Sequence, residues 1–224
     1  MTEIRLPRVL LPVGHDLGAH FADKDSDPTF RVRVGEQMVE FDASEYVVWS
    51  LAHGSIGRGE EWSRADVAAA ATARGLTDVE SVIDRLIEWT MLYDIGLGTD
   101  ESIDFSLVFR PVPLMLGLGT TIDDPDVFSV GLANEAFIQT TRPIYDLYVW
   151  AHLDENLWSA CVASAALAAK DGASAPERTD PRLLMEYFLL GAHDFLAADG
   201  MYFDIARDRS GTHSPVMDIE GGAV

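Results

Sequence analysis

The sequence predicts an α+β protein built from two tandem winged-helix-like modules, each a β-hairpin followed by three helices. Three observations predict this fold. Short runs alternate apolar and charged residues and then turn back at a glycine, which is typical of hairpins. Longer runs place apolar residues at helical spacing. The second half of the 224-residue chain also repeats landmarks of the first half in the same order, which indicates an internal duplication.

The hairpin of the first module is predicted by alternation. Residues 30–34 read Phe-Arg-Val-Arg-Val, a half-buried strand, and residues 38–41 return as its partner after a turn at Gly35. Asp42 or Ser44 follows at once, and either side chain can cap a helix that runs to about residue 53. The first module therefore passes directly from a hairpin into a helix.

Two further helices complete this module. A glycine-rich loop over residues 54–60 precedes Ser63, which caps a second helix over residues 64–74. The third helix, over residues 79–93, has its apolar residues on one face. They are Val79, Val82, Ile83, Leu86, Ile87 and Met91.

The second half follows the same plan. We predict a hairpin over 128–132 and 136–139, a helix that starts at Thr141, a second helix over 158–169, and a long third helix over 180–198. Strands over 9–13 and 109–116 lead into the two modules. The matched landmarks are Leu17-Gly18 with Leu118-Gly119, Asp27-Pro28 with Asp124-Pro125, the helix containing Trp49 with that containing Trp150, Trp62-Ser63 with Trp158-Ser159, and Met91 with Met201.

These matches divide the chain into a first module over residues 1–105, a second over 106–206, and a flexible tail over 207–224 that is rich in glycine and poor in apolar residues. The four paired tryptophans, at positions 49, 62, 150 and 158, are interpreted as core anchors between helices.

The first module resembles the PqqD-like fold, the recognition element that binds leader peptides of ribosomally made natural products. The resemblance rests on residues 38–51, where a hairpin strand runs into a capped helix, on the glycine loop, on the short helix after Ser63, and on residues 79–92. It implies a non-enzymatic accessory or scaffold protein. It also implies that a peptide adds as a strand beside the hairpin and lies against the third helix.

The candidate peptide-binding residues follow from that geometry. Alternation places Arg31 and Arg33 opposite the apolar face of the hairpin, and Arg85, Trp89 and Tyr93 lie on the third helix or directly after it. The competing interpretation is that the arginines are solvated and that Trp89 belongs to the core.

The charge restricts the class of partner. Thirty-seven acidic residues face 16 basic ones, a net charge of −21, which repels nucleic acid and anionic lipid. We expect a protein or peptide partner, for which this charge favours a basic one, or a second copy of the chain. A winged-helix DNA-binding regulator is the first alternative. It would need a basic recognition helix, yet Asp66 lies between Arg64 and Arg74, and the second module offers Lys170 alone.

A metal-dependent enzyme is the second alternative. His15, His20 and Asp23 in the 15–27 tract could hold a transition metal. Asp23, Asp25 and Asp27 have the spacing that opens a calcium loop, but Pro28 and Val34 stand where that loop needs glycine and glutamate. A solvated acidic loop is the simpler interpretation.

The sequence contains no nucleophile elbow, phosphate loop, dinucleotide fingerprint or zinc-protease motif. We therefore expect a binding protein without a cofactor. Cys161 is the one cysteine, which fits a reducing compartment. The absence of a signal-peptide pattern and of a long apolar run predicts a cytoplasmic protein.

Overall fold

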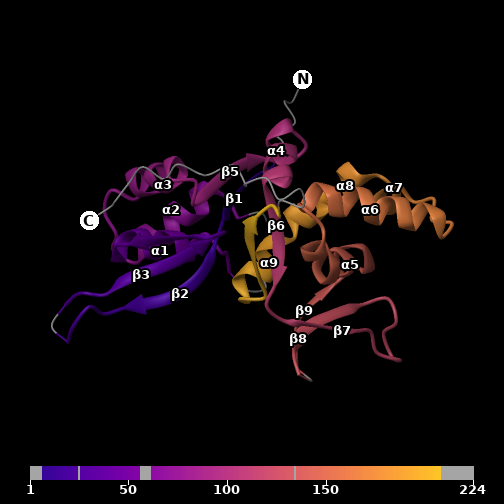
Figure 1. Ribbon diagram of the computed structural model, residues 1–224, viewed down its shortest axis with the longest axis horizontal. Coiled ribbons are helices and arrows are strands. Elements are labelled where there is room, and N and C mark those ends of the chain that lie inside the picture. The colour runs from indigo at the N-terminus through magenta and orange to yellow at the C-terminus, as the bar shows by residue number, and fades with distance from the viewer. Residues whose placement is uncertain (1–6, 25, 56–61, 134, 208–224) are drawn as a thin grey trace.

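The computed structural model describes residues 7–24, 26–55, 62–133 and 135–207, and they form a mixed α+β structure. The first half contains β1 (Arg8–Pro12), β2 (His15–His20), β3 (Thr29–Val34), β4 (Gln37–Phe41), α1 (Ala43–Leu51), α2 (Arg64–Ala73), α3 (Val79–Glu88) and β5 (Leu92–Gly96). Helix α4 (Asp100–Val108) connects it to the second half. Figure 1 shows the helices of the two halves on opposite sides of the molecule, with β1, β6 and α9 between them.

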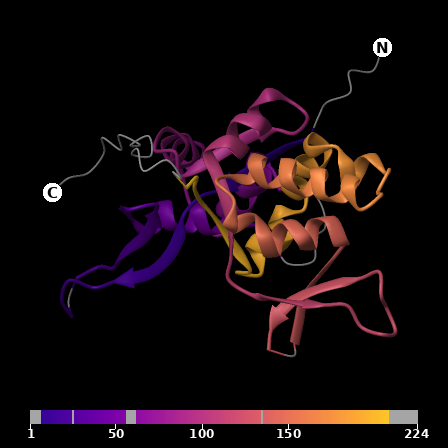
Figure 2. The same ribbon diagram turned by 45° about the vertical axis from the view of Figure 1, so that its right-hand side comes forward.

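The second half contains β6 (Phe109–Pro113), β7 (Leu116–Gly119), β8 (Phe128–Leu132), β9 (Glu135–Thr140), α5 (Arg142–Trp150), the 3-10 helix η1 (Ala151–Leu153), α6 (Leu157–Lys170), α7 (Pro176–Thr179), α8 (Pro181–Leu190), α9 (Ala192–Ala197) and β10 (Met201–Ile205). Figure 2 shows its three-stranded sheet well away from the β2–β3 hairpin of the first half. None of the described helices is long and apolar enough to cross a membrane.

The strands pair in the same way in both halves. The antiparallel sheet β2-β3-β4 of the first half corresponds to β7-β8-β9 of the second, and the pair β1-β5 corresponds to β6-β10. Even an irregularity recurs, because the register of β2 on β3 shifts between Asp16 and Gly18, and that of β7 on β8 between Gly117 and Gly119. Gly18 and Gly119 both have a positive φ, of 79° and 75°, which glycine adopts without strain.

The third helical segments of the two halves end in the same Schellman-type turn. In each half the first residue past the C-cap has a positive φ, 59° at Thr90 and 52° at Asp199. The turns are closed by the bonds Thr90 N to Ile87 O, Met91 N to Leu86 O, Asp199 N to Leu196 O and Gly200 N to Phe195 O, at 2.8–3.0 Å. Trp89 and Ala198, the C-cap residues, therefore occupy equivalent positions. Met91 then corresponds to Gly200, so our sequence match of Met91 with Met201 is one residue off.

The equivalence of Trp49 and Trp150 is wrong. The ring of Tyr46 stacks on Phe30 of β3, and that of Tyr145 lies against Phe128 of β8, so α1 aligns with α5 two residues away from our sequence match. Trp49 then corresponds to Tyr148, and each of these side chains is 1% exposed, whereas Trp150 is 60% exposed. Trp150 is consequently no core anchor.

The polar groups of the aligned side chains Trp49 and Tyr148 form equivalent hydrogen bonds. Trp49 Nε1 donates to the carbonyl of Val13, after β1, and the Tyr148 hydroxyl donates to the carbonyl of Gly200 at 2.7 Å. Both bonds tie the first helix of a half to the strands that frame it, which favours burial of a large amphipathic ring at this position.

The two halves share one hydrophobic core. Phe105 of α4 contacts Tyr93 of β5, Phe109 of β6 and Phe203 of β10, with ring centroids 4.8–5.4 Å apart. Helix α4 spans residues 105 and 106, so the expected module boundary falls inside a helix.

Hydrogen bonds also cross between the halves. Gly14 N donates to the carbonyl of Phe203 at 2.8 Å, Gly35 N donates to Asp204 Oδ1 at 2.7 Å, and His193 Nε2 lies 3.0 Å from the carbonyl of Leu10. Residues of α9 and β10 thereby bind the segments on either side of the strands β2 and β3.

The structure corrects three further sequence interpretations. The expected long helix over 180–198 is two helices, α8 and α9, that meet at Gly191. Residues 170–179, whose many small side chains predict a loop, contain the short helix α7. The tract 15–27, interpreted as an acidic loop, begins with strand β2. Of the expected tail over 207–224, Arg207 alone is described.

Candidate functional site

The two arginines of the predicted peptide surface lie on the outer face of β3, as alternation predicts, and both have partners. Arg31 forms an ion pair with Glu40 of β4 at 2.7 Å. Arg33 donates to the carbonyl of Gly35 and to the hydroxyl of Tyr202, at 2.9 and 3.0 Å. Arg33 thus lies at the junction with the second half.

The three residues from the third helix and the strand after it separate into two places. Arg85 forms an ion pair with the buried Glu45 at 2.9 Å, and its guanidinium lies 5.7 Å from the centre of the Trp89 ring. The ring of Tyr93 instead lies against Phe105 and Phe109, where burial raises the pKa of its hydroxyl. Of the five predicted residues, Arg31 and Arg33 share the outer face of β3, Arg85 and Trp89 lie together on a second surface, and Tyr93 lies apart from both pairs.

The predicted metal ligands are far apart. In the register of β2 on β3, His15 is opposite Arg33 and His20 is opposite Thr29, so the histidines lie at opposite ends of β2. Five residues of extended strand span about 16 Å, too far for two ligands of one ion. The His15 ring packs on Tyr202 with centroids 4.6 Å apart. Within the described ranges, which omit Asp25, no three His, Cys, Asp or Glu residues gather as a metal site.

Arg64, the basic side chain expected at the start of a recognition helix, also forms ion pairs within the protein. Arg64 lies 2.6 Å from Glu80 and 2.7 Å from Asp84, both on α3. Its charge is therefore paired within its own module.

The second half has a pocket at the end of its third helical segment, where Ala198 stands at the position of Trp89. This apolar cavity of about 390 Å³ lies between that end and the β8–β9 hairpin. Its lining residues are Leu114, Met115, Leu132, Phe137, Ala197, Ala198 and Asp199. Gly200 lies close to the β9 side chain of Ile138, which places this cavity beside β9.

Strand β9 gives this pocket a hydrogen-bonding edge. In the described part of the chain β9 pairs with β8 on one side and with no strand on the other. Its sequence, Glu-Ala-Phe-Ile-Gln-Thr, contains neither the proline nor the lysine that often protects an exposed edge. Phe137 is 47% exposed at the mouth of the pocket. We call the edge of β9 together with this cavity the β9 site.

The β9 site combines the three features that bind an extended peptide: unpaired backbone groups, an apolar socket, and one sign of charge. Asp199 is the charged side chain among the described residues that line it. Sequence reasoning missed this site, although the alanine at position 198 would have indicated it once the two third helices were correctly aligned.

Comparison of the chain with protein-family models, with curated proteins and with solved structures found no match to any of them. The function is therefore argued from the geometry alone.

Proposed function

We propose that the protein is a non-enzymatic peptide-binding protein, and that an extended peptide adds as a fourth strand to β9. One observation carries the proposal: the unpaired edge of β9 lies directly beside an apolar pocket of about 390 Å³. Main-chain hydrogen bonds to the edge would supply affinity, and the pocket would select an apolar side chain of the peptide. The resemblance of the first module to PqqD-like proteins implies the same mode of binding for that module, and we extend it here to the second.

The peptide we propose is basic as well as apolar. Asp199 lines the pocket, Glu135 begins β9, and the chain as a whole carries a net charge of −21. A cationic residue beside the apolar anchor would be attracted by this field, whereas a second copy of the same acidic chain would be repelled. We place the protein in the cytoplasm, since the buried thiol of Cys161 fits a reducing compartment.

The test uses fluorescein-labelled basic peptides and a variant designed from the first half. Ala198→Trp puts the tryptophan of position 89 into the second half, so we expect it to fill the pocket and to abolish binding. Phe137→Ala should weaken binding by about tenfold, as expected for an exposed aromatic contact residue. Leu116→Ala is the matched control, because Leu116 is exposed on β7, the opposite edge of the same sheet.

Hydrogen exchange provides the second measurement. Bound peptide should slow exchange of β9 amides and leave the amides of β7 unchanged. Binding that survives Ala198→Trp, or protection that falls on β7, would contradict the proposal. So would the absence of binding across a broad library of basic peptides.

A further inference from the structure

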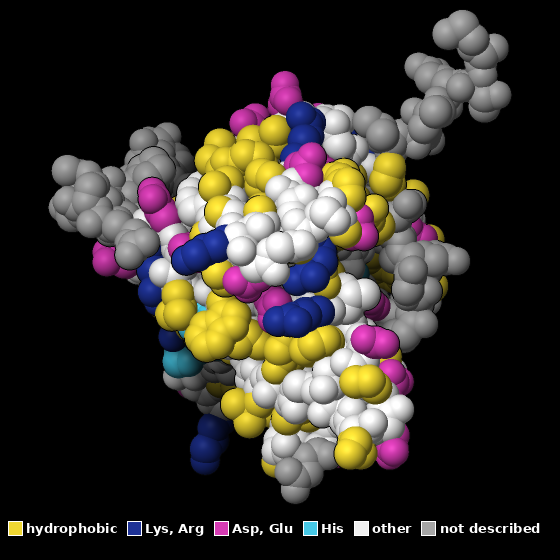
Figure 3. Space-filling model, turned by 90° about the vertical axis from the view of Figure 1, so that its right-hand side faces the viewer, with side chains coloured by type: hydrophobic (Ala, Val, Ile, Leu, Met, Phe, Trp, Pro, Cys, Tyr) yellow, Lys and Arg dark blue, Asp and Glu magenta, His cyan; other side chains and the backbone are white. Residues whose placement is uncertain are grey.

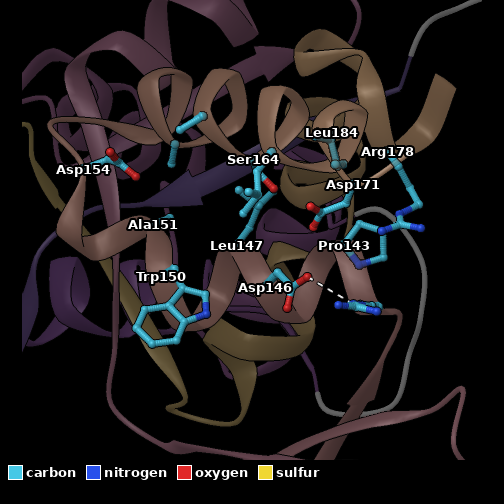
Figure 4. A pocket seen from close by; sticks show the side chains of 15 residues that line it. Pro143, Asp146, Leu147, Trp150, Ala151, Asp154, Ser164, Asp171, Arg178 and Leu184 are labelled. Atoms are coloured by element: carbon cyan, nitrogen blue, oxygen red, sulfur yellow. Dashed lines mark ion pairs between the residues drawn. The ribbon is translucent and has the colours of Figure 1, made fainter. Parts of the chain in front are cut away.

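A second surface of different geometry lies among the helices of the second half. Helices α5, α6 and α8 enclose a groove of about 350 Å³, which Figure 4 shows with its lining side chains. The floor consists of Leu147, Ala151, Ala160 and Leu184, each at most 3% exposed. We call it the helical groove.

The rim of the helical groove exposes large apolar side chains. Trp150, at the end of α5, and Leu167, on α6, are each 60% exposed and line the groove. In the first half, the residue equivalent to Trp150 is Leu51, which is buried. The second half therefore presents an aromatic side chain to solvent at a position that is buried in the core of the first half. Figure 3, which views the molecule from this side, shows hydrophobic side chains gathered on the surface with charged ones among them.

The charges of the groove are not evenly distributed. Figure 4 shows Trp150 and Asp154 toward one end of the groove, and Asp171 and Arg178 toward the other. Asp146, between them, is 3.6 Å from Arg142, and burial raises its pKa. Among the described lining residues three aspartates face two arginines, and Trp150 adds an aromatic face that attracts cations.

The backbone around this groove favours a helical occupant. The lining residues of α5, α6 and α8 lie within or at the ends of helices, whose amides and carbonyls bond within the helix, so the groove offers no strand edge. Along α6 the lining extends from Ala160 to Asp171, which is about 16 Å or three helical turns. The small side chains of Ala163 and Ser164 on this wall leave room for another helix to approach closely.

We propose that the helical groove docks an amphipathic helix of a partner protein, with the helix's apolar face on Leu147 and Leu167 and a lysine or arginine at the end of the groove that holds Trp150. The inference shares with the proposed function the premise that the protein binds polypeptides. It concerns different elements and a different ligand conformation, so the β9 site can fail while the helical groove holds, and the reverse.

The probe is a fluorescein-labelled peptide of about three turns, with a leucine and alanine stripe on one face and lysines in its terminal turns. Two matched peptides carry glutamate in place of lysine, or a central proline that prevents a helix. We expect the lysine peptide to bind best, with affinity falling as salt rises. Trp150→Ala and Leu167→Ala should each weaken binding at least tenfold. Leu190→Ala, which changes a partly exposed leucine of α8 outside the groove, should have no effect.

Tryptophan fluorescence gives an independent readout. Trp150 is exposed, whereas the other four tryptophans are buried or half-buried. Docking should shift the emission to the blue and protect it from iodide quenching, and both effects should vanish in Trp150→Ala.

Three outcomes would overturn the inference: equal affinities for Trp150→Ala and Leu190→Ala, equal binding of the proline peptide, or a dimer of the protein that Trp150→Ala dissociates. The last would assign the surface to a second copy of the chain. Ala198→Trp, which blocks the β9 site, should leave binding of the helical peptide unchanged and so separates the two proposals.

Discussion

Asp204 supplies the most informative single perturbation, since its carboxylate joins strands from both halves. It is buried in β10. Its Oδ1 accepts hydrogen bonds from the amides of Gly35 and Ile205, at 2.7 and 3.0 Å, and its Oδ2 lies 3.4 Å from Arg110 Nη2. Asp204→Ala removes all three interactions at once.

The magnitude follows from the burial of the partner. The Arg110 side chain is 12% exposed, and burial lowers its pKa, so the variant leaves a poorly solvated cation without its carboxylate. Removing one partner of a buried pair costs about 3–5 kcal/mol of unfolding free energy. Asp94→Ala is the matched control, because Asp94 pairs with Arg8 at 3.0 Å on the surface, where the arginine is 40% exposed. We expect it to cost at most about 1 kcal/mol.

Urea unfolding followed by circular dichroism, with linear extrapolation to water, measures both changes. Added salt should shrink the effect of Asp94→Ala and leave that of Asp204→Ala nearly unchanged, because buried pairs are screened little. Equal costs for the two variants, or a cost below about 1 kcal/mol for Asp204→Ala, would refute the view that this carboxylate joins the halves.

Three shorter predictions test other parts of the fold. Trp49→Ala should cost about 3–5 kcal/mol and Trp150→Ala less than about 0.5 kcal/mol in the same unfolding assay; similar losses would restore the alignment that we reject. Burial lowers the pKa of His193 to about 4, so the unfolded chain binds more protons than the folded protein between pH 6.5 and 4. The contribution of His193 to the free energy of unfolding should therefore fall by about 2 kcal/mol from pH 7 to 5. His193→Gln should reduce the dependence of stability on pH, and an unchanged dependence would show that His193 is not its source. Burial also raises the pKa of the Cys161 thiol, so a disulfide reagent should label it only on unfolding; rapid labelling of the native protein would show that the thiol is accessible.

Local sequence patterns predicted the elements whose structure is decided locally. Alternation predicted the β3–β4 hairpin, and the side chains of Asp42 and Ser63 cap α1 and α2 in capping boxes. The apolar face predicted α3. In each case one buried face or one cap is sufficient to define the element.

Elements that depend on distant partners escaped prediction. Strand β2 reads His-Asp-Leu-Gly-Ala-His and has no buried face of its own, because it is an edge strand held by hydrogen bonds to β3. Likewise, β7 carries two glycines. Such strands form because a neighbour supplies the ladder, and their own residues carry little β propensity.

In the candidate site, too, local features could be predicted from the sequence and features that depend on distant partners could not. Alternation placed Arg31 and Arg33 on the correct face of β3, but their partners, Glu40 and Tyr202, follow from strand register and from packing between the halves. The β9 site depends on a comparison between copies, in which the alanine at position 198 matters because a tryptophan stands at position 89. A misalignment of two residues between α1 and α5, caused by matching similar letters, concealed both the exposed Trp150 and the helical groove beside it.

The hydrogen bond between Gly14 and Phe203 has a consequence for biosynthesis. Nearly the whole described chain must leave the ribosome before β10 can reach the amide at the start of the first hairpin. Nascent chains will therefore expose part of their apolar core until β10 has been synthesised. We expect the slow formation of this long-range contact to limit the folding rate. Truncations that stop short of Ile205 should accumulate as aggregates or be degraded, even when the first eight secondary-structure elements are intact.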